Sequence, residues 1–153
     1  MTQRNIKFSL LFFSLMLAFV TVSCSDKDKD VADPTLEVTA NNIQGTWELV
    51  EWNGMPMAEG SYVYLELTRR DRRFTIYQNQ DSFLNRKIEG DYNIIYEDGV
   101  GSIIRGQYDF NGEWSHRYIV TNLTANSMTW VALDDPENVQ VFQRSELPPG
   151  IGE

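Results

Sequence analysis

The chain has very few of the residue types that build reactive sites. Its 153 residues include one cysteine, Cys24, and one histidine, His116. A single cysteine excludes an intramolecular disulfide, and a single histidine excludes a zinc site held by several histidines. The Gly-rich phosphate loop and the Gly-x-Ser-x-Gly and His-Glu-x-x-His motifs are also missing. The sequence therefore predicts no catalytic residue, no metal site and no cofactor, and we expect a protein that is not an enzyme.

Long apolar runs are missing too, apart from one near the N-terminus. Residues 8–22 carry no charge, follow Arg4 and Lys7, and lead through small residues to Cys24. This three-part order is typical of a secretory signal peptide, which we place at residues 1–23. A run of 15 residues is too short to cross a bilayer core comfortably, so we expect no transmembrane helix in the mature protein.

The end of this leader resembles a bacterial lipobox. Residues 21–24 read Thr-Val-Ser-Cys, with Thr21 where leucine is usual. The resemblance implies that the Cys24 sulfur carries a diacylglycerol and that Cys24 becomes the mature N-terminus. The alternative is an ordinary signal peptide with a chance cysteine. Residues 24–41 are polar and acidic and predict a solvated tether. Their Ser-Asp run resembles the surface-export signals of some Gram-negative lipoproteins, which implies an outer membrane lipoprotein exposed on the cell surface.

Positive charge is scarce in the mature chain. Removal of residues 1–23 leaves 11 basic residues against 22 acidic ones, a net charge of −11. Such a charge disfavours nucleic acid as a partner. One exception is the run Arg-Arg-Asp-Arg-Arg at residues 69–73. We interpret it as a solvated hairpin tip, because an isolated basic cluster on an acidic protein is a weak phosphate site.

Helical periodicity is missing after residue 42, whereas strand alternation is frequent. Residues 42–146 are rich in aromatic and β-branched side chains and suffice for one core. They predict eight strands, at residues 45–52, 62–68, 74–78, 86–96, 102–110, 114–123, 128–133 and 139–144. Short turns, including Asn111-Gly112, join them. We therefore predict an all-β fold, an eight-stranded antiparallel up-and-down barrel, followed by an irregular tail at residues 147–153.

The two ends of this predicted barrel carry a recognisable pair of motifs. Gly45-x-Trp47 opens the first strand, and Phe142-x-Arg144 closes the last. Both resemble lipocalin-like domains of small Gram-negative lipoproteins, in which the Trp plugs one end of the barrel. The resemblance implies binding of a small, largely apolar molecule inside. The first and last strands of such a barrel are antiparallel neighbours, so we expect Trp47 to contact Arg144.

The open end is predicted to lie opposite Trp47, where the two longest loops gather. Strand alternation places Trp52 on the face opposite Trp47 and Leu49. We nevertheless expect a ligand-binding rim near the end of the first strand. Its candidate residues are Trp52, Met55, Tyr77, Trp114 and His116. A ligand pocket there is expected to approach roughly 300 Å³.

The sequence is also consistent with a second function. The barrel interior can be filled by side chains, and the protein then acts as a protein-interaction or inhibitor module through its loops. Exposed apolar loop residues support this alternative, namely Met55, Met57, Phe83 and Leu84.

Overall fold

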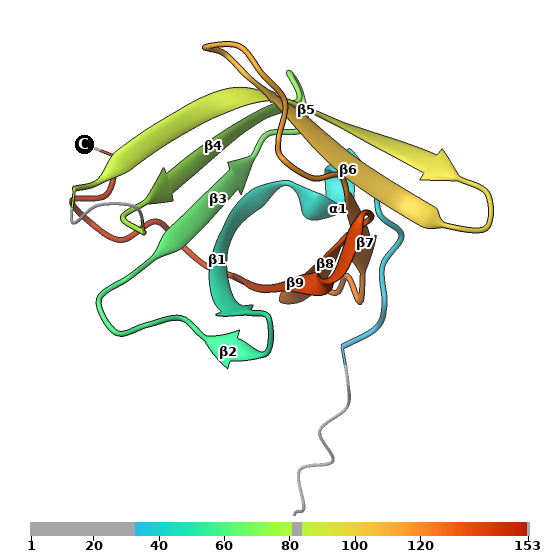
Figure 1. Cartoon of the computed structure of the whole chain (residues 1–153), viewed down its shortest axis with the longest axis horizontal. Coiled ribbons are helices and arrows are strands. Elements are labelled where there is room, and N and C mark those ends of the chain that lie inside the picture. Colours follow the sequence, from blue (N-terminus) through green and yellow to red (C-terminus); the bar gives the residue numbers. More distant parts are fainter. Residues whose placement is uncertain (1–32, 81–83, 153) are drawn as a thin grey trace, which may run out of the picture. The chain divides into compact units, whose positions relative to one another are not determined.

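The structure is a computed structural model that describes residues 33–80 and 84–152. The signal peptide, Cys24, most of the predicted tether and Phe83 lie outside these residues. The described chain has one short helix, α1 (Ala40–Ile43), ahead of nine strands (Figure 1). The strands are β1 (Gly45–Trp52), β2 (Met55–Pro56), β3 (Val63–Leu67), β4 (Arg73–Gln78), β5 (Arg86–Glu97), β6 (Gly101–Tyr108), β7 (Tyr118–Thr121), β8 (Ser127–Ala132) and β9 (Asp135–Arg144).

The strands form a closed antiparallel barrel. Each strand from β3 to β9 pairs with the strand that precedes it in the barrel, and β1 pairs with both β3 and β9. The two-residue β2 folds back onto the end of β1 and adds an extra edge. Without β2 the barrel has eight strands in up-and-down order, so the predicted fold class is confirmed. The closed ring is visible in Figure 1.

The end of the barrel at the start of β1 is plugged by Trp47. This side chain is 0% exposed, and its indole nitrogen donates to the Ile43 carbonyl oxygen at 2.8 Å. Helix α1 lies across this end and is capped by Thr39, whose hydroxyl accepts from the Asn42 backbone nitrogen at 3.2 Å. A capped single turn thus presents the buried Ile43 to the core, and this end is closed.

Arg144 joins the last strand to this plug. Its guanidinium carbon lies 3.7 Å from the centroid of the Trp47 ring, and the two residues are paired across β1 and β9. Its Nε and Nη2 donate at 3.2 Å to the carbonyl oxygens of Ala125 and Asn42, and its Nη1 donates to that of Gln44. The predicted contact between Trp47 and Arg144 is therefore present.

Gly45 makes room for that arginine. A side-chain carbon at position 45 would lie 2.5 Å from Arg144 Nη1, and the φ angle of +113° disfavours any residue with a side chain. The Gly-x-Trp motif thus has a physical meaning in this chain. The missing side chain of Gly45 leaves room for the Arg144 guanidinium, which packs on the ring of Trp47 two residues later.

One strand predicted from the sequence begins later than expected. The strand predicted at residues 114–123 is β7, and it begins at Tyr118 rather than at residue 114. Trp114 turns inward instead, and its indole covers Gly106. A side-chain carbon at Gly106 would lie 2.5 Å from Trp114 Nε1. Gly90 lies in regular register with both neighbouring strands, and the ring of Phe74 packs against it. Both glycines leave room for an aromatic ring of the core, that of Phe74 at Gly90 and that of Trp114 at Gly106.

Candidate functional site

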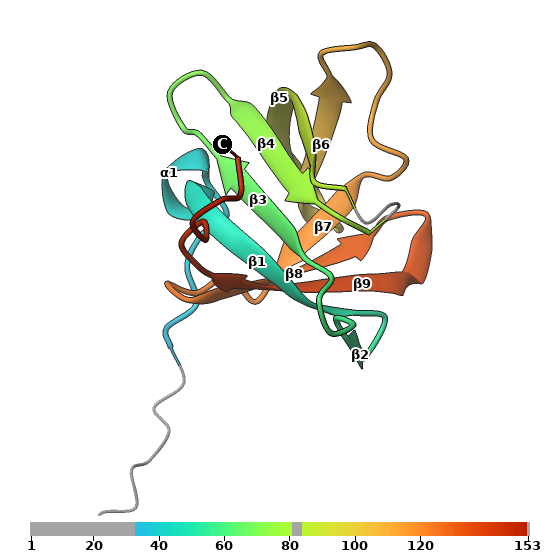
Figure 2. The same cartoon turned by 90° about the vertical axis from the view of Figure 1, so that its left-hand side faces the viewer.

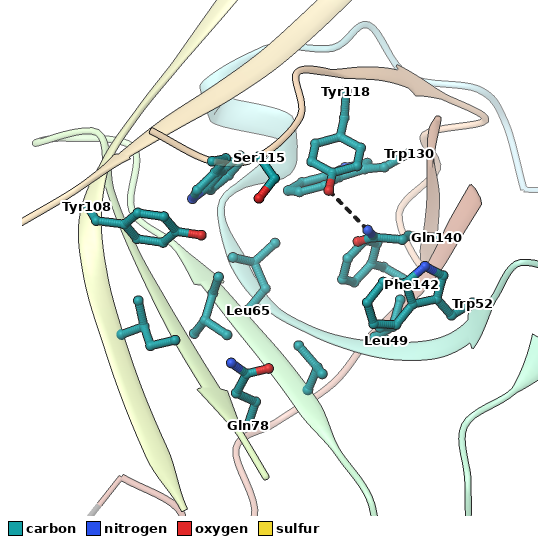
Figure 3. Close-up of a pocket in the computed structure, with 14 residues that line it drawn as sticks. Leu49, Trp52, Leu65, Gln78, Tyr108, Ser115, Tyr118, Trp130, Gln140 and Phe142 are labelled. Carbon is teal, nitrogen blue, oxygen red and sulfur yellow. Dashed lines mark hydrogen bonds between the residues drawn. The ribbon is translucent and has the colours of Figure 1, made fainter. Parts of the chain in front are cut away.

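A cavity of about 180 Å³ opens at the end of the barrel opposite Trp47. Its mouth lies at the end of β1, the start of β3 and the end of β4, where the sequence predicted the open end. Figure 3 shows side chains from several strands pointing into it. They are Leu49, Trp52, Val63, Leu65, Ile76, Gln78, Ile88, Tyr108, Trp114, Ser115, Tyr118, Trp130, Gln140 and Phe142.

The cavity is smaller than the roughly 300 Å³ expected for a ligand pocket. An aromatic wall explains the difference. The ring of Trp130 lies 5.6 Å from that of Trp114, 5.4 Å from that of Tyr118 and 4.9 Å from that of Phe142. Part of the aromatic surplus therefore fills the barrel and limits the open volume. A void of similar size in another protein is known to hold a benzene molecule.

Polar groups are concentrated at the mouth of this cavity. Gln140 Nε2 donates to the Tyr118 hydroxyl at 3.3 Å, shown as a dashed line in Figure 3, and to Asn138 Oδ1 at 3.4 Å. Trp52 Nε1 also donates to Asn138 Oδ1, at 3.2 Å. Burial raises the pKa of the Tyr118 hydroxyl, so this group stays a neutral donor. The mouth therefore has fixed hydrogen-bonding groups above an apolar interior.

Two indole nitrogens in the cavity wall are buried without a partner among the described residues. They belong to Trp114 and Trp130. An indole nitrogen can only donate a hydrogen bond. A buried donor without an acceptor costs about 1 to 3 kcal/mol. Trp114 Nε1 faces Gly106, so at least this donor is enclosed within the wall and does not face the cavity.

The first of the predicted rim residues, Trp52, does line the cavity, but the expected strand alternation is wrong there. The pairing of β1 with β9 runs regularly to Leu49, then skips Val50 and resumes at Glu51. This β-bulge adds one residue, so Trp52 faces the same interior as Leu49 instead of the opposite face.

Tyr77 is not at the rim, and its predicted place there is wrong. Its neighbours Ile76 and Gln78 line the cavity, so alternation along β4 turns Tyr77 to the outer surface. There the C-terminal tail covers it, with Gly152 packed closely against its ring.

His116 and Met55 also lie outside the cavity. His116 Nδ1 lies 2.9 Å from Asp134 Oδ1 in a surface loop, and this hydrogen bond lowers the pKa of the Asp134 carboxyl. Met55 is 68% exposed on β2. Of the five candidates, Trp52 and Trp114 are thus brought together in the cavity wall.

Sequence reasoning missed Tyr118 and Gln140. Gln140 stands two residues before Phe142, so it shares the inner face of the last strand. Alternation along the last strand could therefore have identified Gln140 as an inward-facing residue from the sequence alone. Tyr118 stands four residues after Trp114, so alternation along the predicted strand placed it on the same face as that candidate.

Comparison with protein-family models and with curated proteins gives no match. The fold alone therefore defines the class, a closed antiparallel β-barrel compatible with a lipocalin-like fold. Among the described residues, no helix is long and apolar enough to span a membrane. In the same part of the chain, no three potential metal ligands come together.

Proposed function

We propose that this protein is a lipid-anchored, non-catalytic binding protein of the bacterial outer membrane. In this proposal Cys24 carries the lipid, and the barrel holds a small, largely apolar molecule non-covalently at its open end. The cavity beside Trp52 and Trp114 is the observation that carries the binding proposal. The anchor and the cell-surface location are supported by the sequence of the leader and tether.

The shape and chemistry of the cavity narrow the ligand class. A volume of about 180 Å³ accommodates one ring or a short branched chain, and the open mouth allows a larger molecule to insert only such a part. The Tyr118 hydroxyl and the Gln140 amide, which both line the cavity, favour a group with a hydrogen-bond acceptor. We therefore propose a ring-sized apolar group that carries a carbonyl or ether oxygen.

A soluble fragment is suitable for testing this binding. Every buried residue of the hydrophobic core lies between Ile43 and Phe142, and residues 36 and 38 pack against it. The chain from residue 32 onward is also one compact unit. A fragment of residues 33–153 thus retains the whole barrel and its core.

The test compares acetophenone with ethylbenzene, which is close to it in shape but lacks the carbonyl oxygen. We expect acetophenone to bind more tightly and to shift the indole N–H signals of Trp114 and Trp130 in a ¹H–¹⁵N NMR titration. The signal of the buried Trp47 at the closed end serves as an internal control. Ile76→Phe fills the cavity and should abolish the shifts, whereas Thr75→Phe on the outer face should not. Equal binding of both probes, or binding unaffected by Ile76→Phe, would contradict the proposal.

A protein-interaction role is the second candidate. Its support is a set of large apolar side chains at the open end, since Met55 is 68% and Leu84 is 74% exposed. Met57 does not belong to this surface, because it packs against the core. Copurification of a partner with the wild-type protein, lost in the double variant Met55→Ser, Leu84→Ser, would favour this role. Retention of the partner by that variant would count against it.

A further inference from the structure

Three arginines at the closed end form no ion pair with an acidic residue in the described part of the chain. Arg69, Arg70 and Arg72 lie in the exposed turn between β3 and β4, and none of them forms an ion pair with a described carboxylate. The next arginine is different. Arg73 is held between Asp91, at 3.2 Å, and Asp109, and these carboxylates raise the pKa of its guanidinium. Among the described residues, carboxylates thus form ion pairs with one arginine of this turn and not with the other three.

The turn is held in place rather than loosely solvated. The backbone nitrogen of Tyr92 donates to the Arg72 carbonyl oxygen at 2.7 Å, and the Tyr92 hydroxyl donates to the Thr68 carbonyl oxygen at 3.0 Å. The Arg72 guanidinium lies 6.0 Å from the Tyr92 ring. Asp71 accepts from the Thr68 hydroxyl, which lowers the pKa of its carboxyl, so Asp71 offsets one of the three positive charges. Arg73 with Asp91 and Asp109 adds one negative charge, so the turn and its partners carry a net charge of +1 on a fixed surface.

The three arginines border an open hollow of about 900 Å³ between the turn and α1. Arg69 Nη1 donates to Asn41 Oδ1 at 2.8 Å across it. The other walls carry short polar side chains, those of Thr39, Gln44 and Thr68. Guanidinium groups are the donors that best recognise a phosphate group. We name these arginines and their hollow the arginine face.

The arginine face lies at the end of the barrel where the N-terminal segment enters. Asn126, in the β7–β8 turn, donates to Asp33 at 2.7 Å, and the Leu36 backbone nitrogen donates to the Leu123 carbonyl oxygen. Figure 2 shows this segment, α1 and the β3–β4 turn at the same end. Cys24 precedes Asp33 by nine residues, which span at most about 32 Å. A lipid at Cys24 would therefore keep the arginine face close to the bilayer surface.

We propose that the arginine face docks on the anionic phosphate headgroups of the membrane that holds the anchor, so that the cavity mouth points away from the bilayer. This inference rests on the proposed lipidation of Cys24. The net charge of −11 does not prevent it, because salt screens charges beyond about 8 Å and the nearest face then dominates. Arginine gives the surface a donor set that suits a phosphate group.

The test uses the mature lipidated protein in lipid nanodiscs that contain a gadolinium-chelating lipid. Paramagnetic broadening of NMR signals then measures which end of the barrel lies near the headgroups. In discs with phosphatidylglycerol, we expect signals of residues 39–44 and 68–72 to broaden more than those of the turn at residues 133–134. Each arginine near an anionic surface changes the docked-to-free ratio about fivefold, so replacing three lowers it about 100-fold.

The triple variant Arg69→Gln, Arg70→Gln, Arg72→Gln should lose the preference. A control with the same change in net charge, Lys87→Gln, Arg105→Gln, Arg117→Gln, should keep it. Equal broadening of both ends, or a preference retained by the first variant, would overturn the proposal. Signals of the turn that shift with inorganic pyrophosphate but show no preference in the discs would assign the face to a soluble anion instead. The intact mass of the protein separates the two proposals, because a missing lipid refutes the anchor itself.

Discussion

Replacement of Arg144 by lysine should open the closed end of the barrel without changing the charge. The guanidinium covers the Trp47 ring at 3.7 Å and donates to three backbone carbonyl groups. A lysine ammonium has no planar face and cannot reach three separate carbonyl oxygens at once. Two of those oxygens, from residues 42 and 44, belong to α1 and the residue that ends it. Their loss should therefore loosen the plug itself.

The expected magnitude follows from these contacts. A desolvated cation–π contact contributes roughly 1 to 2 kcal/mol, of which lysine keeps a part. Hydrogen bonds from a charged donor contribute about 1.5 to 3 kcal/mol each, with the lower end appropriate for a half-buried group. Allowing for replacement by water, we expect Arg144→Lys to lower the free energy of unfolding by about 2 to 3 kcal/mol. The melting temperature of a domain this size should then fall by about 10 °C.

Urea unfolding of the fragment of residues 33–153, followed by circular dichroism and tryptophan fluorescence, measures this change. The matched control is Arg105→Lys on the exposed outer face of β6, where we expect a change below about 0.5 kcal/mol. The denaturant dependence should stay the same in both variants, since the unfolded chain exposes the same surface. An Arg144→Lys variant as stable as the control would refute the view that the arginine secures closure.

Two further predictions concern the core and the response to acid. Gly106→Ala should displace the Trp114 ring and lower the free energy of unfolding by about 1 to 3 kcal/mol. The NMR signal of the Trp114 indole N–H should shift in this variant. The control Ser102→Ala, on the same strand, should leave that signal unchanged. The hydrogen bonds from Arg73 lower the pKa of the Asp109 carboxyl in the folded state. The ion pair therefore stabilises the fold fully above the unfolded-state pKa of about 3.9. This stabilisation is lost as the pH falls through the lower pKa of the folded state. Melting curves should therefore show Arg73→Gln less stable than wild type at pH 7, with a difference that shrinks as the pH falls below about 3.9. A difference that stays constant with pH would contradict this assignment.

The fold was predictable from the sequence because strands and turns have local sequence patterns, and because closing a barrel determines which strands are neighbours. Alternation and turn residues define most strands, and an even number of strands in up-and-down order requires the first and last to meet. The contact of Trp47 with Arg144 follows from that requirement. The mouth was predictable for the same reason, since the direction of each strand determines which turns share an end.

The site was less predictable because it depends on which face each strand turns inward. The bulge at Val50 has no distinct sequence signature, yet it alone brings Trp52 into the cavity. Trp114 leaves the sheet because Gly106, on another strand, provides a place for its ring. The cavity volume depends on how tightly the aromatic rings pack, which strand patterns do not specify. Tyr77 is a different case, because plain alternation already places it outside.

Native mass spectrometry of the lipidated protein, released gently from its own bacterial envelope, tests ligand binding most directly. We predict a 1:1 complex with a small molecule that contains a ring-sized apolar group and an oxygen acceptor. The same preparation of Ile76→Phe, with its filled cavity, should carry no such mass, whereas Thr75→Phe should retain it. A protein that carries no small molecule, or one that Ile76→Phe retains equally well, would contradict the proposed binding function.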